Sequence, residues 1–191
     1  MKICVIGTGT MAKGIVKAFA AKMPVVMKSR TQESLDKAMG SFAKGYGKLV
    51  EKGKLTQEAV DAILANITTT TDYATFADAD LVIEAAVENM QLKKDVFTEL
   101  DKICKPETVF ATNSSSLSIT EIAACTSRPD KFIGMHFFNP ADRMALVEVI
   151  KGQKTSEEVC NCIVELASSI GKTPVLVNEA PGFVVNRILI P

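Results

Sequence analysis

Short apolar runs alternate along the chain with longer segments in which apolar residues recur every three or four positions. The runs lie at residues 3–6, 25–27, 81–83, 109–111, 132–135, 146–150 and 175–177. Runs of this length are typical of strands buried on both faces, and spacings of three and four are typical of amphipathic helices. Strands that alternate with helices predict an α/β fold, with a mostly parallel sheet covered by helices.

A long helical stretch follows the second apolar run, between residues 31 and 66. The pattern breaks near Gly53, and Thr56 and Glu58 start it again. We therefore expect a helical hairpin inserted after the second strand. Its first arm carries the apolar residues Leu35, Met39, Phe42, Tyr46, Leu49 and Val50.

A glycine-rich turn joins the first apolar run to the first helical segment. The segment Gly7-Thr8-Gly9-Thr10-Met11-Ala12 fits the pattern G-x-G-x-x-G/A in the place where a dinucleotide-binding turn belongs. Free N–H groups and the helix dipole at such a helix start favour a pyrophosphate. The turn predicts a Rossmann-like, doubly wound fold whose cofactor contacts include Gly7, Gly9, Thr10 and Met11. A turn that serves only packing is the alternative.

The end of the second strand bears on the choice of cofactor. An acidic residue about 20 positions past the turn normally binds the ribose hydroxyls of NAD. Here the strand ends in Lys28-Ser29-Arg30, and the first carboxylate after it is Glu33. A hydroxyl and a guanidinium suit a 2′-phosphate. The sequence favours NADP(H) bound at Ser29 and Arg30, with NAD(H) or a merely solvated basic edge as alternatives.

The only histidine of the chain, His136, lies near the carboxyl end of an apolar run. Open α/β sheets bind ligands at that end of their strands. Glu148 interrupts the next apolar run, and a buried carboxylate requires a partner. We expect the imidazole to be that partner, so that the pair forms a general acid/base with its orienting carboxylate. A histidine packed in the core is the alternative.

Composition narrows the class of protein. The 191 residues are 47% hydrophobic and 23% charged, which suits one or two globular domains. The 22 basic and 22 acidic residues cancel, so we expect neither nucleic acid nor a membrane as partner. The sequence has no apolar run of about 18 residues and no signal segment, and so predicts a cytoplasmic protein. The cysteines lack paired C-x-x-C spacing, and no metal is expected.

Five segments resemble, in order and spacing, the motifs of the 3-hydroxyacyl-CoA dehydrogenase family, and the match runs through the whole chain. The resemblance implies an oxidoreductase that interconverts acetoacetyl-CoA and (S)-3-hydroxybutyryl-CoA, as in bacterial butyrate and butanol fermentation or fatty acid metabolism. The segments are Gly7-Thr8-Gly9-Thr10-Met11, Glu84-Ala85-Ala86-Val87-Glu88-Asn89, Thr112-Asn113-Ser114-Ser115-Ser116-Leu117, Gly134-Met135-His136-Phe137-Phe138-Asn139-Pro140 and Pro181-Gly182-Phe183-Val184-Val185-Asn186-Arg187.

Carried over by position, the resemblance assigns the chemistry to four residues. It implies that His136 donates a proton when the ketone is reduced and accepts one in the reverse direction, with Glu148 holding and polarising the imidazole. It implies that Ser115 and Asn186 hydrogen-bond the substrate near the reacting carbon.

The resemblance also implies contacts with the cofactor and with CoA. Glu88, Lys93 and Asn113 would line the nicotinamide ribose. The helical hairpin would meet the CoA phosphates, although a solvated helix end is the alternative for each of its basic residues, Lys48, Lys52 and Lys54.

The family usually carries an acidic residue at the position of Ser29, and this departure again favours NADP(H). The resemblance implies that residues 1–184 form the NAD(P)-binding and catalytic domain, and that residues 185–191 start a truncated C-terminal helical domain through which the full-length protein forms a homodimer. Two alternative functions remain open. One is a related dehydrogenase of a 3-hydroxy acid that carries no CoA, and the other is a nucleotide-binding module without turnover.

Overall fold

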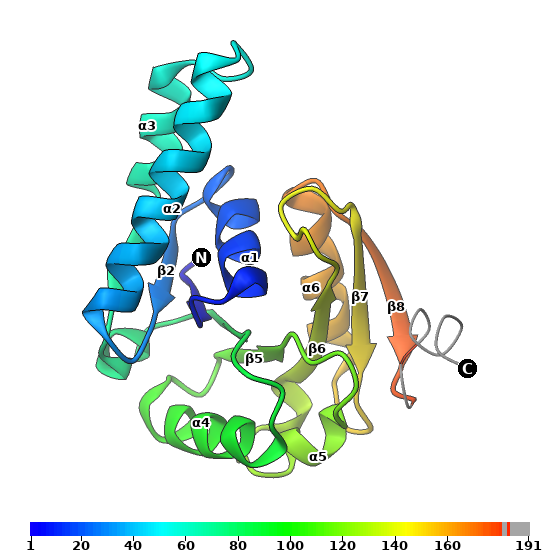
Figure 1. The fold of residues 1–191 in the computed structure, drawn as a ribbon. Coiled ribbons are helices and arrows are strands. Elements are labelled where there is room, and N and C mark those ends of the chain that lie inside the picture. The colour runs from blue at the N-terminus through cyan, green and yellow to red at the C-terminus, as the bar shows by residue number, and fades with distance from the viewer. Residues whose placement is uncertain (181–182, 184–191) are drawn as a thin grey trace.

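A computed structural model describes residues 1–180 and residue 183. One sheet, whose strands run in the order β3-β2-β1-β4-β5-β6-β7-β8, forms the centre of the molecule (Figure 1). Helices pack on both of its faces, which confirms the predicted doubly wound α/β fold. The strands are β1 (Ile3–Ile6), β2 (Val25–Lys28), β3 (Ile67–Thr70), β4 (Leu81–Glu84), β5 (Val109–Thr112), β6 (Phe132–Phe137), β7 (Leu146–Lys151) and β8 (Thr173–Asn178).

The sheet is mostly parallel, as the sequence predicted. Neighbours from β3 through β6 pair in parallel, β6 and β7 pair antiparallel, and β8 returns parallel to β7. The edge strand β3 was not predicted. Its sequence, Ile67-Thr68-Thr69-Thr70, places only Ile67 in the core, so the strand gives no hydrophobic run that a pattern search detects.

The predicted helical hairpin is present and projects beyond the sheet (Figure 1). Its arms α2 and α3 are separated by Gly53, which has a φ of +63° that favours glycine. The Thr56 hydroxyl accepts a hydrogen bond from the N–H of Ala59 and so caps α3. The helices are α1 (Thr10–Ala20), α2 (Gln32–Glu51), α3 (Gln57–Ala65), α4 (Met90–Ile103), α5 (Ile119–Ala123) and α6 (Glu157–Ser169), with short 3-10 turns η1 (Tyr73–Phe76) and η2 (Pro129–Lys131).

Apolar side chains on the two faces of the sheet form two cores. In β2, Val25 and Met27 pack toward α1 and α2, whereas Val26 packs toward the side of η1 and α4. This alternation follows from the strand geometry, which points successive side chains to opposite faces. Strand order reverses between β1 and β4, and the carboxyl ends of the parallel strands meet there, where doubly wound folds bind ligands.

Three expectations concern residues outside the described part of the chain. They are the boundary at residue 184, the start of a second domain at residues 185–191, and the role of Asn186. In the described part, no helix has both the length and the apolar composition that crossing a membrane requires.

Candidate active site

A cleft of about 800 Å³ opens at the carboxyl ends of the parallel strands. Its walls come from the turn after β1, the tip of β2, the start of η1, the segment after β4, one side of α4 and the ends of β5 and β6. The fold thus gathers predicted site residues that are far apart in the sequence. Those lining the cleft are Gly7, Gly9, Thr10, Met11, Ser29, Arg30, Glu88, Asn113, Ser115 and His136.

The glycine turn leaves room for a ligand against the backbone. Gly7 has a φ of +122°, and a methyl group there would lie 2.8 Å from the carbonyl oxygen of Ala85. A methyl group at Gly9 would meet no atom within 4 Å, so this backbone faces open space. Side chains cap the first turns of α2 to α6, whereas Gly9 leaves the first turn of α1 without such a bond. The free N–H groups of α1 fit a pyrophosphate.

The tip of β2 forms the other end of the cleft. Ser29 and Arg30 both line it, and their contact with a cofactor ribose or its 2′-phosphate stays a prediction. Lys28 and Tyr73, to which sequence reasoning gave no role, also line the cleft here. The ammonium of Lys28 lies 3.5 Å from the centroid of the Tyr73 ring. The sequence does indicate a role for Lys28, because this lysine is the last residue of an otherwise apolar strand and its charge therefore lies at the end of the sheet.

The predicted His136–Glu148 pair is present. The two residues face each other across the antiparallel strands β6 and β7, and Nδ1 of His136 lies 2.8 Å from Oε2 of Glu148. Both side chains are buried, with exposed fractions of 8% and 2%. With Nδ1–H donating to the carboxylate, Nε2 is the imidazole nitrogen that exchanges a proton with a ligand. His136 lines the cleft, and Glu148 lies behind it.

Glu88 organises the serine cluster. Its Oε1 accepts hydrogen bonds from the Ser114 hydroxyl at 2.6 Å and from the Ser115 N–H at 2.9 Å. Burial raises the pKa of Glu88, but the bond from Ser114 and the charge of Lys93 outweigh that effect and hold the pKa below its usual value of 4.5. The side chain of Glu88 is therefore an ionised anchor for the segment that carries Ser115.

Lys93 supports Glu88 from behind instead of lining the cleft. Its side chain is 1% exposed, and its ammonium lies 3.3 Å from Oε2 of Glu88 and contacts both oxygens of Glu84 at 2.8 and 2.7 Å. A direct contact of Lys93 with the ribose stays a prediction. Sequence reasoning gave Glu84 no role, although it closes an apolar strand in the way that Glu148 interrupts one. Its fully buried carboxylate also accepts bonds from Thr112 and from the N–H of Ala86.

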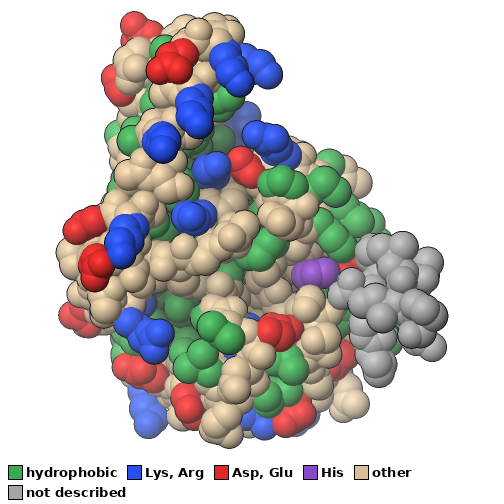
Figure 2. Space-filling view, in the orientation of Figure 1, with side chains coloured by type: hydrophobic (Ala, Val, Ile, Leu, Met, Phe, Trp, Pro, Cys, Tyr) green, Lys and Arg blue, Asp and Glu red, His purple; other side chains and the backbone are tan. Residues whose placement is uncertain are grey.

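Asn113 joins the ends of two strands at the cleft. Its Oδ1 accepts a hydrogen bond of 2.9 Å from the N–H of Phe137, next to His136. The hairpin lysines lie elsewhere, because none of them lines the cleft. Figure 2 shows basic side chains spread over the projecting hairpin, whose exposed residues include Lys48, Lys52 and Lys54.

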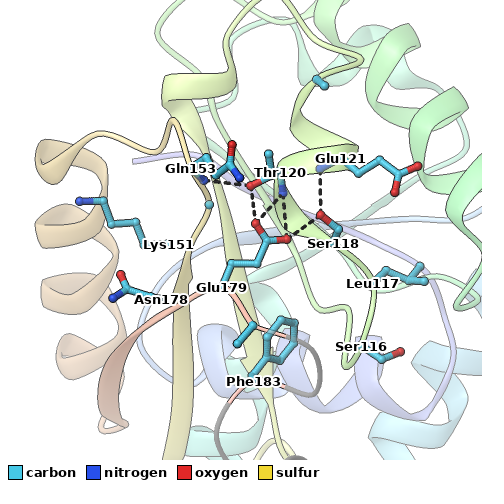
Figure 3. Close-up of a pocket in the computed structure, with 13 residues that line it drawn as sticks. Ser116, Leu117, Ser118, Thr120, Glu121, Lys151, Gln153, Asn178, Glu179 and Phe183 are labelled. Atoms are coloured by element: carbon cyan, nitrogen blue, oxygen red, sulfur yellow. Dashed lines mark hydrogen bonds between the residues drawn. The ribbon is translucent and has the colours of Figure 1, made fainter.

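A second cavity of about 690 Å³ lies beside α5 and the ends of β7 and β8 (Figure 3). Its central carboxylate, Glu179, accepts hydrogen bonds from the Ser118 hydroxyl at 2.6 Å and from the N–H and hydroxyl of Thr120. Its described lining residues include no histidine, because the only histidine of the chain lines the cleft. The cleft is therefore the candidate active site.

Comparison with known proteins agrees with this geometry. The family model described as the NAD binding domain of 3-hydroxyacyl-CoA dehydrogenase matches residues 2–180. A 3-hydroxybutyryl-CoA dehydrogenase of Clostridioides difficile is 56% identical over 192 residues, which cover 100% of this chain and 68% of that protein. A probable 3-hydroxybutyryl-CoA dehydrogenase of Deinococcus radiodurans is 50% identical and matches 100% of this chain and 69% of its own length.

A solved structure gives the same result. The crystal structure of (S)-3-hydroxybutyryl-CoA dehydrogenase from Ralstonia eutropha superposes with a TM-score of 0.95 at 42% identity, covering 98% of this chain and 67% of that one. The range of residues 2–180 that the family model matches contains the glycine turn, the serine cluster and the His136–Glu148 pair. The chain therefore belongs to the 3-hydroxyacyl-CoA dehydrogenase family, as its motifs predicted.

Proposed function

We propose that the chain catalyses the reversible, nicotinamide-dependent interconversion of acetoacetyl-CoA and (S)-3-hydroxybutyryl-CoA. The observation that carries the proposal is the buried His136–Glu148 pair, in the same cleft as the glycine turn. Relatives at 56% and 50% identity are named for this substrate. The bound nicotinamide supplies the hydride for reduction of the ketone carbon and takes it up in oxidation.

His136 handles the proton of the reaction. Reduction places a hydride on the ketone carbon and requires a proton on the ketone oxygen, which Nε2 of His136 donates. In oxidation the same nitrogen accepts the hydroxyl proton. Glu148 fixes the orientation of the ring through Nδ1 and stabilises the positive charge of the protonated imidazole. The pair is assembled before substrate binds, so its geometry costs no reorganisation during the reaction.

Ser115 and Asn186 orient the substrate in this proposal. The backbone of Ser115 is held by Glu88, which itself is held by the buried Lys93. Ser115 lines the cleft near the strand end that carries His136, and its hydroxyl lies 3.4 Å from Oε1 of Glu88. A hydrogen bond to the substrate oxygen would hold the ketone in the orientation that proton transfer requires.

Different segments of the cleft contact different parts of the cofactor in this proposal. The turn at Gly7 and Gly9 binds the pyrophosphate, and Glu88 and Asn113 lie where the nicotinamide ribose would be held. Ser29 and Arg30, at the tip of β2, favour a 2′-phosphate over a free hydroxyl pair, and we therefore propose NADP(H) as the preferred cofactor.

The basic residues of the hairpin favour a CoA ester over a free 3-hydroxy acid as the substrate. We propose that Lys48, Lys52 and Lys54 attract the CoA phosphates, since all three are exposed at one end of the hairpin. Replacing them together by Gln should raise the KM for acetoacetyl-CoA and leave the KM for the acetoacetyl thioester of N-acetylcysteamine unchanged, because that thioester lacks the phosphates. Lys37→Gln, in the helix that also carries Lys48 and paired with Glu33, is the control.

The direct test follows the absorbance of reduced nicotinamide with acetoacetyl-CoA, with NADPH and NADH in parallel. The assay is run on residues 1–191 and on a longer chain that includes the C-terminal helical domain. We propose that this domain starts at residues 185–191, after the catalytic domain of residues 1–184, and forms a homodimer. Turnover supports the proposed reaction, and activity limited to the longer chain assigns a contribution to the second domain. No turnover in either chain would favour a binding module.

A further inference from the structure

The tip of β2 holds a buried lysine that the proposed reaction does not use. Lys28 is 6% exposed and lines the cleft. Within the described residues, no carboxylate lies within 4.0 Å of its ammonium, whereas the other buried lysine, Lys93, is paired with Glu84 and Glu88. A buried charge without a counter-ion is costly unless a ligand provides one. Lys28 is thus a positive group that lines the cofactor cleft without a carboxylate in direct ion-pair contact.

Tyr73 fixes the position of this charge without neutralising it. The ammonium of Lys28 lies 3.5 Å from the centroid of the Tyr73 ring, within the range of a cation–π contact. Burial raises the pKa of Tyr73 to about 12, so that its phenol is neutral near pH 7. The ring itself packs edge-on against Phe76. Tyr73 therefore holds the ammonium at the cleft wall while the charge stays available.

Charges of both signs surround Lys28. Burial lowers the pKa of Lys28, the more distant carboxylates of Glu99 and Asp72 raise it, and the like charge of Arg30 lowers it. Arg30 lines the same end of the cleft. Two cations near one another in a partly dry site repel each other until an anion lies between them. A phosphate monoester, with two negative charges near neutral pH, has the charge that this site lacks.

We infer that Lys28, together with Arg30, binds the phosphate at the 2′ position of the cofactor adenosine, and that Lys28 is the main determinant of NADP(H) preference. This inference rests on the proposed function and adds a residue to its cofactor site. The pyrophosphate has its own N–H donors at the start of α1. The 2′-phosphate is the remaining phosphate of NADP(H), and the tip of β2 is where an adenosine ribose binds in this fold.

The test uses two fragments of the cofactor that differ only in this phosphate. Adenosine 2′,5′-bisphosphate and 5′-AMP are titrated calorimetrically into the wild-type chain and into Lys28→Met, which keeps the length and apolar stem of the side chain. Affinity for the bisphosphate should fall by about 10- to 100-fold, the effect of losing one charged hydrogen bond. Affinity for 5′-AMP should change by less than about 3-fold. Neither fragment requires turnover.

Two further variants guard against a general loss of structure. Lys28→Arg retains the charge and should keep the preference for the bisphosphate, even where Lys28→Met folds poorly. Lys22→Met, an exposed lysine after α1 that does not line the cleft, is the matched control for loss of one charge and should change neither affinity.

The outcomes separate this inference from the proposed function. Equal losses for both fragments in Lys28→Met, or no loss for the bisphosphate, would overturn the role of Lys28 while the preference set by Ser29 and Arg30 stands. A wild-type chain that binds both fragments equally would overturn the NADP(H) preference and the role of Lys28 together. The proposed reaction would then stand with NADH as its cofactor.

Discussion

The two ends of the cleft differ in the origin of their counter-charges. At the end of β6, the imidazole of His136 has Glu148 as its partner, and both groups are buried. At the tip of β2, the ammonium of Lys28, a residue that is 6% exposed, has an aromatic ring as its neighbour and no carboxylate within 4.0 Å in the described chain. The first end is complete before a ligand arrives, whereas the second lacks a negative charge that a ligand would supply.

This difference matches what each end has to do. Proton transfer requires a group that is already oriented, because reorientation during the reaction would raise the barrier. Recognition requires an interaction that forms only with the correct ligand, because a charge already satisfied by the protein gives no selectivity.

The largest effect is expected at the end of β6, where His136 is already paired with Glu148. In His136→Gln, the amide retains a hydrogen bond to Glu148 but does not transfer a proton, and turnover should fall by about 1,000-fold. The Kd for NADPH, measured by calorimetry, should change by less than about 2-fold, since the cofactor contacts are elsewhere. Loss of both turnover and cofactor binding would mean that His136 is structural.

The next effect concerns the partner of the histidine. Glu148→Gln keeps the shape of the side chain but no longer stabilises a protonated imidazole, and kcat should fall by about 100-fold with little change in cofactor affinity. Glu179→Gln in the second cavity is the control, because it removes a carboxylate that is also hydrogen-bonded and is absent from the cleft lining. Equal losses of kcat in the two variants would contradict a special role for Glu148.

A smaller effect is expected at the tip of β2. Ser29→Asp places a carboxylate where an NAD-specific site has one, so the ratio of kcat/KM for NADPH to that for NADH should fall by about 10-fold or more. Ser29→Asn introduces a side chain of nearly the same size as Asp but without its charge, and should shift the ratio of the two kcat/KM values less. An unchanged ratio in Ser29→Asp would show that this residue does not contact the ribose.

The smallest effect is a pH-dependent change in the stability of the fold, caused by Glu88, which lines the cleft. The folded-state pKa of Glu88 lies below 4.5, so its ionised form stabilises the fold above that pH, and the contribution is lost as the pH falls through the lower folded value. Glu88→Gln should therefore lower the Tm at neutral pH, and the difference from wild type should shrink below pH 4.5. Thermal melts at several pH values measure this difference.

Glu107→Gln is the matched control for that experiment, because it removes one exposed carboxylate between α4 and β5. A Tm difference between wild type and Glu88→Gln that stays constant down to pH 3 would contradict the anchoring role of the ionised Glu88 side chain.

Local patterns in the sequence determined the fold class, the hairpin and the glycine turn. Buried strands read as apolar runs, and Gly7 and Gly9 follow from the backbone that a dinucleotide turn requires. The His136–Glu148 pair was predictable because a carboxylate in an apolar strand requires a partner, and the chain has only one histidine. The strand β3 was missed because an edge strand of threonines has no apolar run.

Only the tertiary structure decided which polar residues share one site. It placed Lys93 behind Glu88, brought Tyr73 under Lys28 and put the hairpin lysines away from the cleft lining. These placements depend on strand order and on how turns far apart in the chain pack at one edge of the sheet. A hydrophobic pattern predicts which residues are buried, because its periodicity places apolar residues on the same face of a helix or strand. It does not record which buried charges face one another, because that depends on contacts between distant segments.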